Sequence, residues 1–244
     1  MRIKVFTYFL FFSLLGFSQL EDDTYYRESS IGINFNTSGG LIGGLTGRMA
    51  FRANDTRFNV VSLEIVHVKH NKEQKFASQA TGNGFIPGKT NYLFSMRPQF
   101  GQEYLLFNKY PEEGIQLSFV FAGGPSFGFV KPYFIEYDYT DYSSTTAFPD
   151  YRTEAYDPEI HTDDSRILGS GGVFYGFNQM SVMLGANFKA GLNFEFGKYK
   201  DAVLGVEAGF TYEAYTKPIQ LYPIENNPNS FSSVYFTIYV GTRD

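Results

Sequence analysis

The segment from Ser181 to Phe196 reads SVMLGANFKAGLNFEF, and its two alternating sets of positions differ in chemistry. The even positions are all apolar and run Val182, Leu184, Ala186, Phe188, Ala190, Leu192, Phe194 and Phe196. The odd positions include Lys189 and Glu195. Because successive side chains of a β-strand point to opposite faces, the segment predicts a strand with one apolar and one charged face.

The same alternation recurs along the rest of the chain. Its apolar positions fall within residues 31–35, 41–51, 61–65, 92–96, 115–121, 202–212 and 234–240. No stretch of comparable length shows a 3.6-residue period, so we expect few helices. Together with 181–196, these segments predict about eight strands.

Strand length favours a membrane protein over a soluble sandwich. Strands of soluble domains usually have about five or six residues, whereas crossing a bilayer at a tilt takes roughly 9–11. The runs that begin at Leu41 and Ser181 are at least that long. Their uncharged faces are therefore expected to meet hydrocarbon.

The connections between these segments alternate in length. Short ones lie near 53–56, 108–114 and 197–201, and long ones near 70–90, 140–172 and 216–230, while the first hairpin, around 36–40, is a short exception. Outer-membrane barrels have short periplasmic turns and longer extracellular loops. The chain is thus predicted to be all-β, an antiparallel up-and-down transmembrane β-barrel with long extracellular loops.

Composition narrows the possible functions. The chain has no Cys, which excludes disulfides, thiolate metal sites and a lipoprotein anchor. Its formal net charge of −5 argues against a nucleic-acid partner, which would require a basic face. It has 27 Phe and 19 Tyr, residues that pack well on pleated sheets.

The N-terminus resembles a secretory signal peptide. Arg2 and Lys4 precede an apolar run from Val5 to Leu15, and small residues precede Gln19. We expect residues 1–18 to be removed on export and residues 19–244 to form the barrel domain. An N-terminal membrane anchor is the alternative.

Charged residues recur on the second face of the predicted strands. They are Arg48, Glu64, Arg97, Lys189, Glu195, Glu207 and Glu213. An eight-stranded barrel has an interior just wide enough for side chains to fill it, and an unpaired buried charge is costly. We expect these residues to form a charge network in the lumen, with a proton or ion path as the alternative.

Tyrosines fall near many predicted strand ends. They include Tyr92, Tyr133, Tyr137, Tyr139, Tyr212, Tyr215 and Tyr235. Outer-membrane barrels carry aromatic girdles at both membrane interfaces. The spacing predicts such girdles, and ordinary packing within the sheet is the alternative.

No motif carries a complete catalytic site. Residues 124–128 match G-x-S-x-G, but that motif requires a strand–turn–helix elbow, and here it lies in a β-segment. The acidic loop around His161 lacks the ligand spacing of an EF-hand, although hard oxygen ligands there could hold Ca²⁺. A hydrolase built on Ser126 or Ser165 with His161 is a further alternative. We expect no catalytic residue, metal or cofactor.

Several segments resemble a family of small bacterial outer-membrane β-barrel proteins. The matching residues are Gly123-Gly124-Pro125-Ser126, Lys131-Pro132, Tyr156-Asp157-Pro158-Glu159 with His161, 191–197 and Lys217-Pro218-Ile219. The resemblance covers most of the chain after residue 18 and brings no catalytic residues with it. It implies a barrel that sits beside larger barrels in a protein-insertion or secretion machine. Outer-membrane barrels commonly end on an aromatic residue, whereas here a short polar tail follows Val240.

The expected function is therefore that of a non-enzymatic structural or accessory subunit of a larger outer-membrane complex in a Gram-negative bacterium. The expected partners are the lipid bilayer and larger outer-membrane proteins. The long loop supplies a candidate contact surface, formed by Tyr156, Asp157, Pro158, Glu159 and His161. A barrel that binds a small apolar ligand and a lipid-modifying barrel enzyme are the alternatives.

Overall fold

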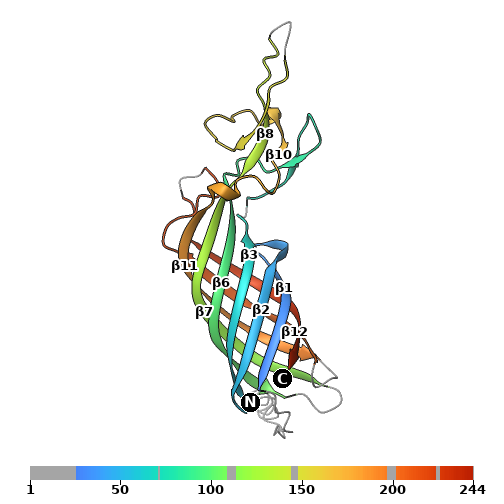
Figure 1. Ribbon diagram of the computed structural model, residues 1–244, viewed down its shortest axis with the longest axis vertical. Helices are drawn as coiled ribbons and strands as arrows, with labels where there is room; N and C mark the ends of the chain where they lie inside the picture. Colours follow the sequence, from blue (N-terminus) through green and yellow to red (C-terminus); the bar gives the residue numbers. More distant parts are fainter. Residues whose placement is uncertain are drawn as a thin grey trace, which may run out of the picture.

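A closed barrel of eight antiparallel strands forms the body of the molecule (Figure 1). The computed structural model describes residues 26–70, 72–108, 114–143, 148–196, 202–223 and 226–243. The barrel strands are β1 (Arg27–Asn36), β2 (Gly40–Asn54), β3 (Arg57–Val68), β6 (Asn91–Phe107), β7 (Ile115–Pro132), β11 (Ser181–Phe196), β12 (Ala202–Tyr215) and β13 (Ser230–Arg243). The expected signal peptide, residues 1–18, lies outside the described residues.

The strand order confirms the predicted up-and-down topology. Each barrel strand pairs with the barrel strands before and after it in the chain, and β1 pairs with β13 to close the barrel. The closing register runs from Glu28 opposite Arg243 to Asn36 opposite Tyr235. Residues 241–243, expected as a polar tail, are therefore part of β13, because they continue its pairing with β1.

The predicted division of the strand faces is also confirmed. Along β11, Val182 and Leu184 are each 55% exposed and Phe188 is 50% exposed, whereas Lys189 is only 3% exposed. The outward positions of the other barrel strands are likewise mostly apolar, with polar or charged ones toward the strand ends, and the inward ones are mostly polar. Alternation with period two thus places one set of side chains on the outer wall and the other in the lumen.

The three long connections gather at one end of the barrel (Figure 1). We call the described residues within 69–90, 133–180 and 216–229 the cap. It holds a hairpin of β4 (Phe76–Ala77) and β5 (Gly84–Phe85), and a sheet of β8 (Phe134–Asp138), β9 (Tyr151–Ala155) and β10 (Ile167–Ser170). Two 3₁₀ helices, η1 (Asp164–Arg166) and η2 (Phe177–Gln179), complete it.

The cap is larger than the expected 140–172 loop. Its middle connection begins at Tyr133, where the chain leaves β7, and β8 follows at once. Only one residue separates β8 from β7, so the sequence shows no clear boundary between the two strands. The backbone N–H of Tyr133 donates to the carbonyl oxygen of Thr90 at 2.8 Å, which ties the cap sheet to the neighbouring connection.

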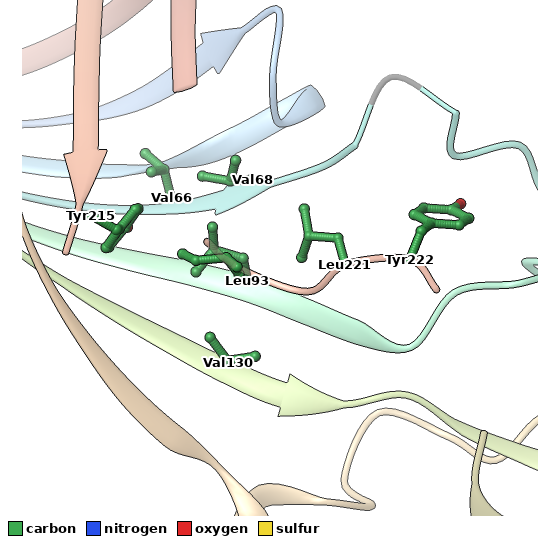
Figure 2. Close-up of a cluster of buried hydrophobic side chains, with 8 residues drawn as sticks. Val66, Val68, Leu93, Val130, Tyr215, Leu221 and Tyr222 are labelled. Atoms are coloured by element: carbon green, nitrogen blue, oxygen red, sulfur yellow. The ribbon is translucent and has the colours of Figure 1, made fainter. Parts of the chain in front are cut away.

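An apolar cluster closes the cap end of the barrel (Figure 2). Val66, Val68, Leu93, Val130 and Tyr215 come from the barrel strands, and Ile219, Leu221 and Tyr222 come from the connection after β12. Ile219 and Leu221 are fully buried. The carbonyl oxygen of Leu221 accepts a hydrogen bond from the backbone N–H of Thr90 at 3.0 Å. This connection therefore folds inward over the barrel mouth.

Most of the tyrosines expected in interfacial girdles lie elsewhere. Tyr133, Tyr137, Tyr215 and Tyr235 are buried, and of the seven only Tyr212 is an outward, exposed residue of the barrel wall, with Tyr92 half-buried. Position near a strand end does not show whether a side chain faces the lumen or the outside, because that depends on whether the residue is at an odd or an even position of the strand.

No helix within the described ranges is long and apolar enough to cross a membrane.

Candidate functional site

Five charged side chains form a connected cluster in the half of the lumen nearer the cap. Arg97 makes a bidentate contact with Glu213, at 3.1 Å from Nε and 2.6 Å from Nη2. Lys189 lies 2.9 Å from Glu64 and 3.0 Å from Glu207, and Arg97 Nη1 lies 3.8 Å from Glu64. We call this group the cap-side cluster.

A second cluster lies toward the opposite end of the lumen. Arg48 pairs with Glu28 at 3.2 Å and with Glu103. Arg243 pairs with Glu28 at 3.0 Å and with Glu195. We call this group the far cluster. In both clusters, every charged side chain is buried and pairs with at least one side chain of opposite sign.

The structure divides the seven expected lumen residues between these clusters. The cap-side cluster contains Glu64, Arg97, Lys189, Glu207 and Glu213, and the far cluster contains Arg48 and Glu195. Sequence reasoning missed Glu28, Glu103 and Arg243, which lie beyond the clearest alternation. Continuing the alternation to the ends of each strand would have found them. Glu103 is an odd-numbered position of β6, as is the inward Arg97, and Arg243 is an odd-numbered position of β13, as is the inward Tyr239.

Neutral polar side chains complete the hydrogen bonding of the lumen. Gln99 accepts a hydrogen bond from Ser62 Oγ at 3.0 Å and donates to Asn187 Oδ1 at 2.7 Å. Tyr235 donates its hydroxyl to Glu207 at 2.7 Å, and Asn193 donates to Glu103 at 3.0 Å. The lumen is therefore filled with paired polar groups, whereas a barrel for a small apolar ligand would have an apolar lumen.

The G-x-S-x-G segment lies in the middle of β7 and forms no nucleophile elbow. Ser126 is fully buried, and its Oγ accepts a hydrogen bond from Asn187 Nδ2 at 3.0 Å. His161 belongs to the cap, so the two residues proposed together for a hydrolase lie in different parts of the molecule. Ser165 Oγ donates to Asp163 at 2.6 Å at the start of η1.

His161 joins Glu154 on β9 to Tyr139 and Asp157, which lie just outside the cap strands. It is 2% exposed, and its Nδ1 accepts a hydrogen bond from the backbone N–H of Asp157 at 2.9 Å. Its Nε2 then faces Glu154 Oε1 at 3.1 Å and the Tyr139 hydroxyl at 3.3 Å. The hydrogen bond from Tyr139, followed by that from His161, holds the pKa of Glu154 below its ordinary value.

The expected partner-contact segment is only partly at the surface. Tyr156, Asp157 and Pro158 are half-buried, Glu159 is exposed and His161 is buried. The ring of Tyr156 stacks on His161 with centroids 5.7 Å apart. A partner on this face would therefore meet Glu159 and the neighbouring Ile160, which is 57% exposed.

Acidic residues of the cap are engaged with neighbours in the chain. Asp150 pairs with Arg152 at 2.5 Å, and Asp157 Oδ1 accepts from the backbone N–H of Glu159 at 2.9 Å. Across the described ranges, no group of three or more His, Asp and Glu side chains is arranged to hold a metal ion. The cap instead exposes large apolar side chains, which the sequence analysis did not single out, such as Phe148 and Phe174.

Comparisons with known proteins do not assign this chain to a family. No family model and no curated protein matches the sequence. Crystal structures of Ail, the attachment invasion locus protein of Yersinia pestis, are similar at 10% identity, with TM-scores of 0.40 and, in complex with the heparin analogue sucrose octasulfate, 0.39. Each comparison covers 91% of this chain and 100% of Ail.

Neisserial surface protein A is similar at 11% identity and a TM-score of 0.39, over 90% of this chain and 97% of that protein. Such distant similarity leaves the fold to be established by the chain's own hydrogen-bonded strands. Those strands make the protein a small, closed, eight-stranded antiparallel β-barrel.

Proposed function

We propose that this chain spans the outer membrane of a Gram-negative bacterium and acts there as a non-enzymatic structural or accessory subunit of a larger outer-membrane protein complex. The observation that carries the proposal is the chemistry of the outer wall. The lumen and the cap supply the arguments for the subunit role.

The outer wall is apolar around the whole barrel. No Asp, Glu, Lys or Arg occupies an outward position within 31–35, 45–51, 61–65, 94–100, 115–129, 182–196, 204–212 and 234–240. Many of these side chains are large and exposed, among them Ile31, Leu45, Phe100 and Val240. Soluble monomers rarely expose apolar patches beyond roughly 300–600 Å². Hydrocarbon is a favourable environment for this apolar wall. The closed barrel also leaves no unpaired strand edge in the bilayer.

The interior favours a structural role over catalysis. Each charge of the cap-side cluster is held by partners from other strands, as Lys189 is by Glu64 and Glu207. Such groups stabilise one another and are not poised to react with a substrate. The apolar cluster around Leu221 closes the lumen at the cap end.

The cap supports the role in a complex. Its β8–β9 hairpin extends away from the barrel (Figure 1). Exposed aromatic side chains gather on this hairpin, with Phe148 84%, Tyr142 67% and Tyr151 60% exposed. Aromatic residues are enriched at the centres of protein interfaces. Larger outer-membrane proteins are the partners that such a projecting surface would meet.

The membrane location is tested by cell fractionation followed by gel migration with and without boiling. We expect the protein in the outer-membrane fraction and a different migration of the unboiled, folded barrel. Recovery in the soluble periplasmic fraction would contradict the proposal.

The subunit role is tested by placing a photo-crosslinking amino acid at Phe148 in the native cells. We expect it to capture larger outer-membrane proteins after extraction in mild detergent. The same label at Asp55, in the short turn at the opposite end, serves as the matched control. A lone monomer with the label at Phe148, in several mild detergents, would count against the complex.

A further inference from the structure

The connection between β10 and β11 presents a run of exposed apolar side chains. Val173 is 72% exposed and Phe174 is 88% exposed, and Tyr175 and Phe177 are about half exposed. Residues 171–182 contain no charged side chain. Gly172 precedes the run and Gly176 lies within it, with φ of 92° and 85°, a left-handed backbone that other residues rarely adopt. We call residues 172–177 the apolar loop.

A buried lysine fixes the shape of the apolar loop. Lys131, near the end of β7, donates from Nζ to the carbonyl oxygens of Val173 at 3.0 Å and Tyr175 at 2.8 Å. Its ammonium also lies 5.1 Å from the ring centroid of Phe177. The loop backbone is thus held against the barrel, so its apolar side chains remain exposed without collapsing onto one another.

The alternation of side chains along β7 places the contact between Lys131 and the apolar loop on the outside of the barrel wall. Lys131 shares the outward parity of Phe127 and Phe129 on β7, and Phe129 is paired with the exposed Val182 of β11. Figure 1 shows η2, which begins at Phe177, at the cap end of β7. The apolar loop therefore continues the apolar wall at its cap end.

Aromatic residues on the adjacent strands extend the same band. Tyr92 is the register partner of Lys131, and its ring lies 5.1 Å from the Lys131 ammonium. Tyr92 stacks on Phe94 with centroids 6.2 Å apart, and Phe94 stacks on His67 at 5.0 Å. These rings resemble the aromatic girdles at the bilayer surface, and they lie beside the loop.

We propose that the apolar loop inserts into the outer leaflet at the level where acyl chains meet headgroups, and that it fixes the depth of the cap end of the barrel. This inference rests on the proposed membrane location. A lipid surface is the occupant because the loop is uncharged, continues the outward apolar wall and is held against the barrel by Lys131. The neighbouring Asn178 and Gln179 then lie at headgroup level.

The absence of Trp from the chain makes the test direct. Three single-Trp variants are reconstituted into phosphatidylcholine vesicles whose acyl chains are brominated either near the headgroup or near the chain end. Phe174→Trp reports on the apolar loop, Phe236→Trp on the barrel wall and Phe148→Trp on the far part of the cap. Heat-modifiable migration verifies that each variant is folded.

We expect Phe174→Trp to emit at shorter wavelength than Phe148→Trp and to lose most of its emission to bromine near the headgroup, with a smaller loss to bromine near the chain end. Phe148→Trp should keep its emission in both vesicles. If Phe236→Trp is quenched and Phe174→Trp is not, the loop insertion is wrong while the membrane barrel stands. If Phe236→Trp is not quenched, the membrane location fails and the loop insertion fails with it.

Discussion

At the scale of single residues, the lumen depends on charge pairs contributed by strands far apart in the sequence. Lys189 on β11 lies between Glu64 on β3 and Glu207 on β12. Residue type and parity were sufficient to predict that these side chains turn inward. They were not sufficient to predict the partners, because pairing depends on which strands face one another across the lumen.

Lys189→Met should destabilise the barrel strongly. It leaves Glu64 and Glu207 buried without their shared cation, and removing one partner of a buried ion pair typically costs about 3–5 kcal/mol. Urea unfolding in detergent micelles measures the loss. The control is Lys217→Met on the exposed part of the cap, expected to change stability by less than about 0.5 kcal/mol. Equal stability of the two variants would refute the structural role of the cap-side cluster.

His161→Ala should loosen the cap and leave the barrel intact. The imidazole joins Glu154, Tyr139 and the backbone at Asp157, and its loss leaves a cavity among stacked rings. We expect limited proteolysis to cut the cap faster, while the barrel keeps its heat-modifiable migration. A lipid-modifying role for His161 predicts altered outer-membrane lipids in cells carrying this variant, and our account predicts unchanged lipids.

At the scale of elements, the barrel strands could be predicted and the cap could not. A strand such as β11 repeats its alternation over 16 residues, so the signal is strong. The cap strands have two to five residues. They are held by long-range contacts, such as the hydrogen bond from Ser78 Oγ to the carbonyl oxygen of Ile167 at 2.7 Å. Such short segments have no detectable period, and their pairing is set by tertiary structure.

Leu221→Ala should weaken the closure of the barrel mouth. Leu221 is fully buried in the apolar cluster, and such truncations cost about 2–5 kcal/mol. Hydrogen exchange should show faster exchange of the backbone amides of Thr90 and Ile219, which are hydrogen-bonded at this closure. Ile160→Ala, on an exposed side chain, is the control. Unchanged protection in Leu221→Ala would show that the connection is held by other contacts.

Lys131→Met should release the apolar loop. The carbonyl oxygens of Val173 and Tyr175 lose their donor, so the loop is expected to lose its fixed shape. In the Phe174→Trp background, we expect weaker quenching by bromine near the headgroup. Lys131→Arg should restore it in part because it keeps a donor and a positive charge. Quenching that is unaffected by Lys131→Met would mean that the glycines alone shape the loop.

At the scale of the whole molecule, one property of the sequence organises the structure. Each barrel strand has an apolar and a polar face, and closure turns all the apolar faces outward. This explains why Arg243, next to the end of the chain, lies in the lumen beside Glu28 and Glu195. The sequence pattern predicted the architecture because a shift of one residue in any strand would exchange its two faces.

The central claim is that the outer wall meets hydrocarbon. It is tested most directly by nitroxide scanning along β11, which is straightforward because the chain has no native Cys. Labels at Val182, Leu184, Phe188, Leu192 and Phe196 are measured in vesicles for collisions with oxygen and with a water-soluble nickel complex. We predict high oxygen accessibility and low nickel accessibility at the central positions. High nickel accessibility along the whole strand would contradict the account.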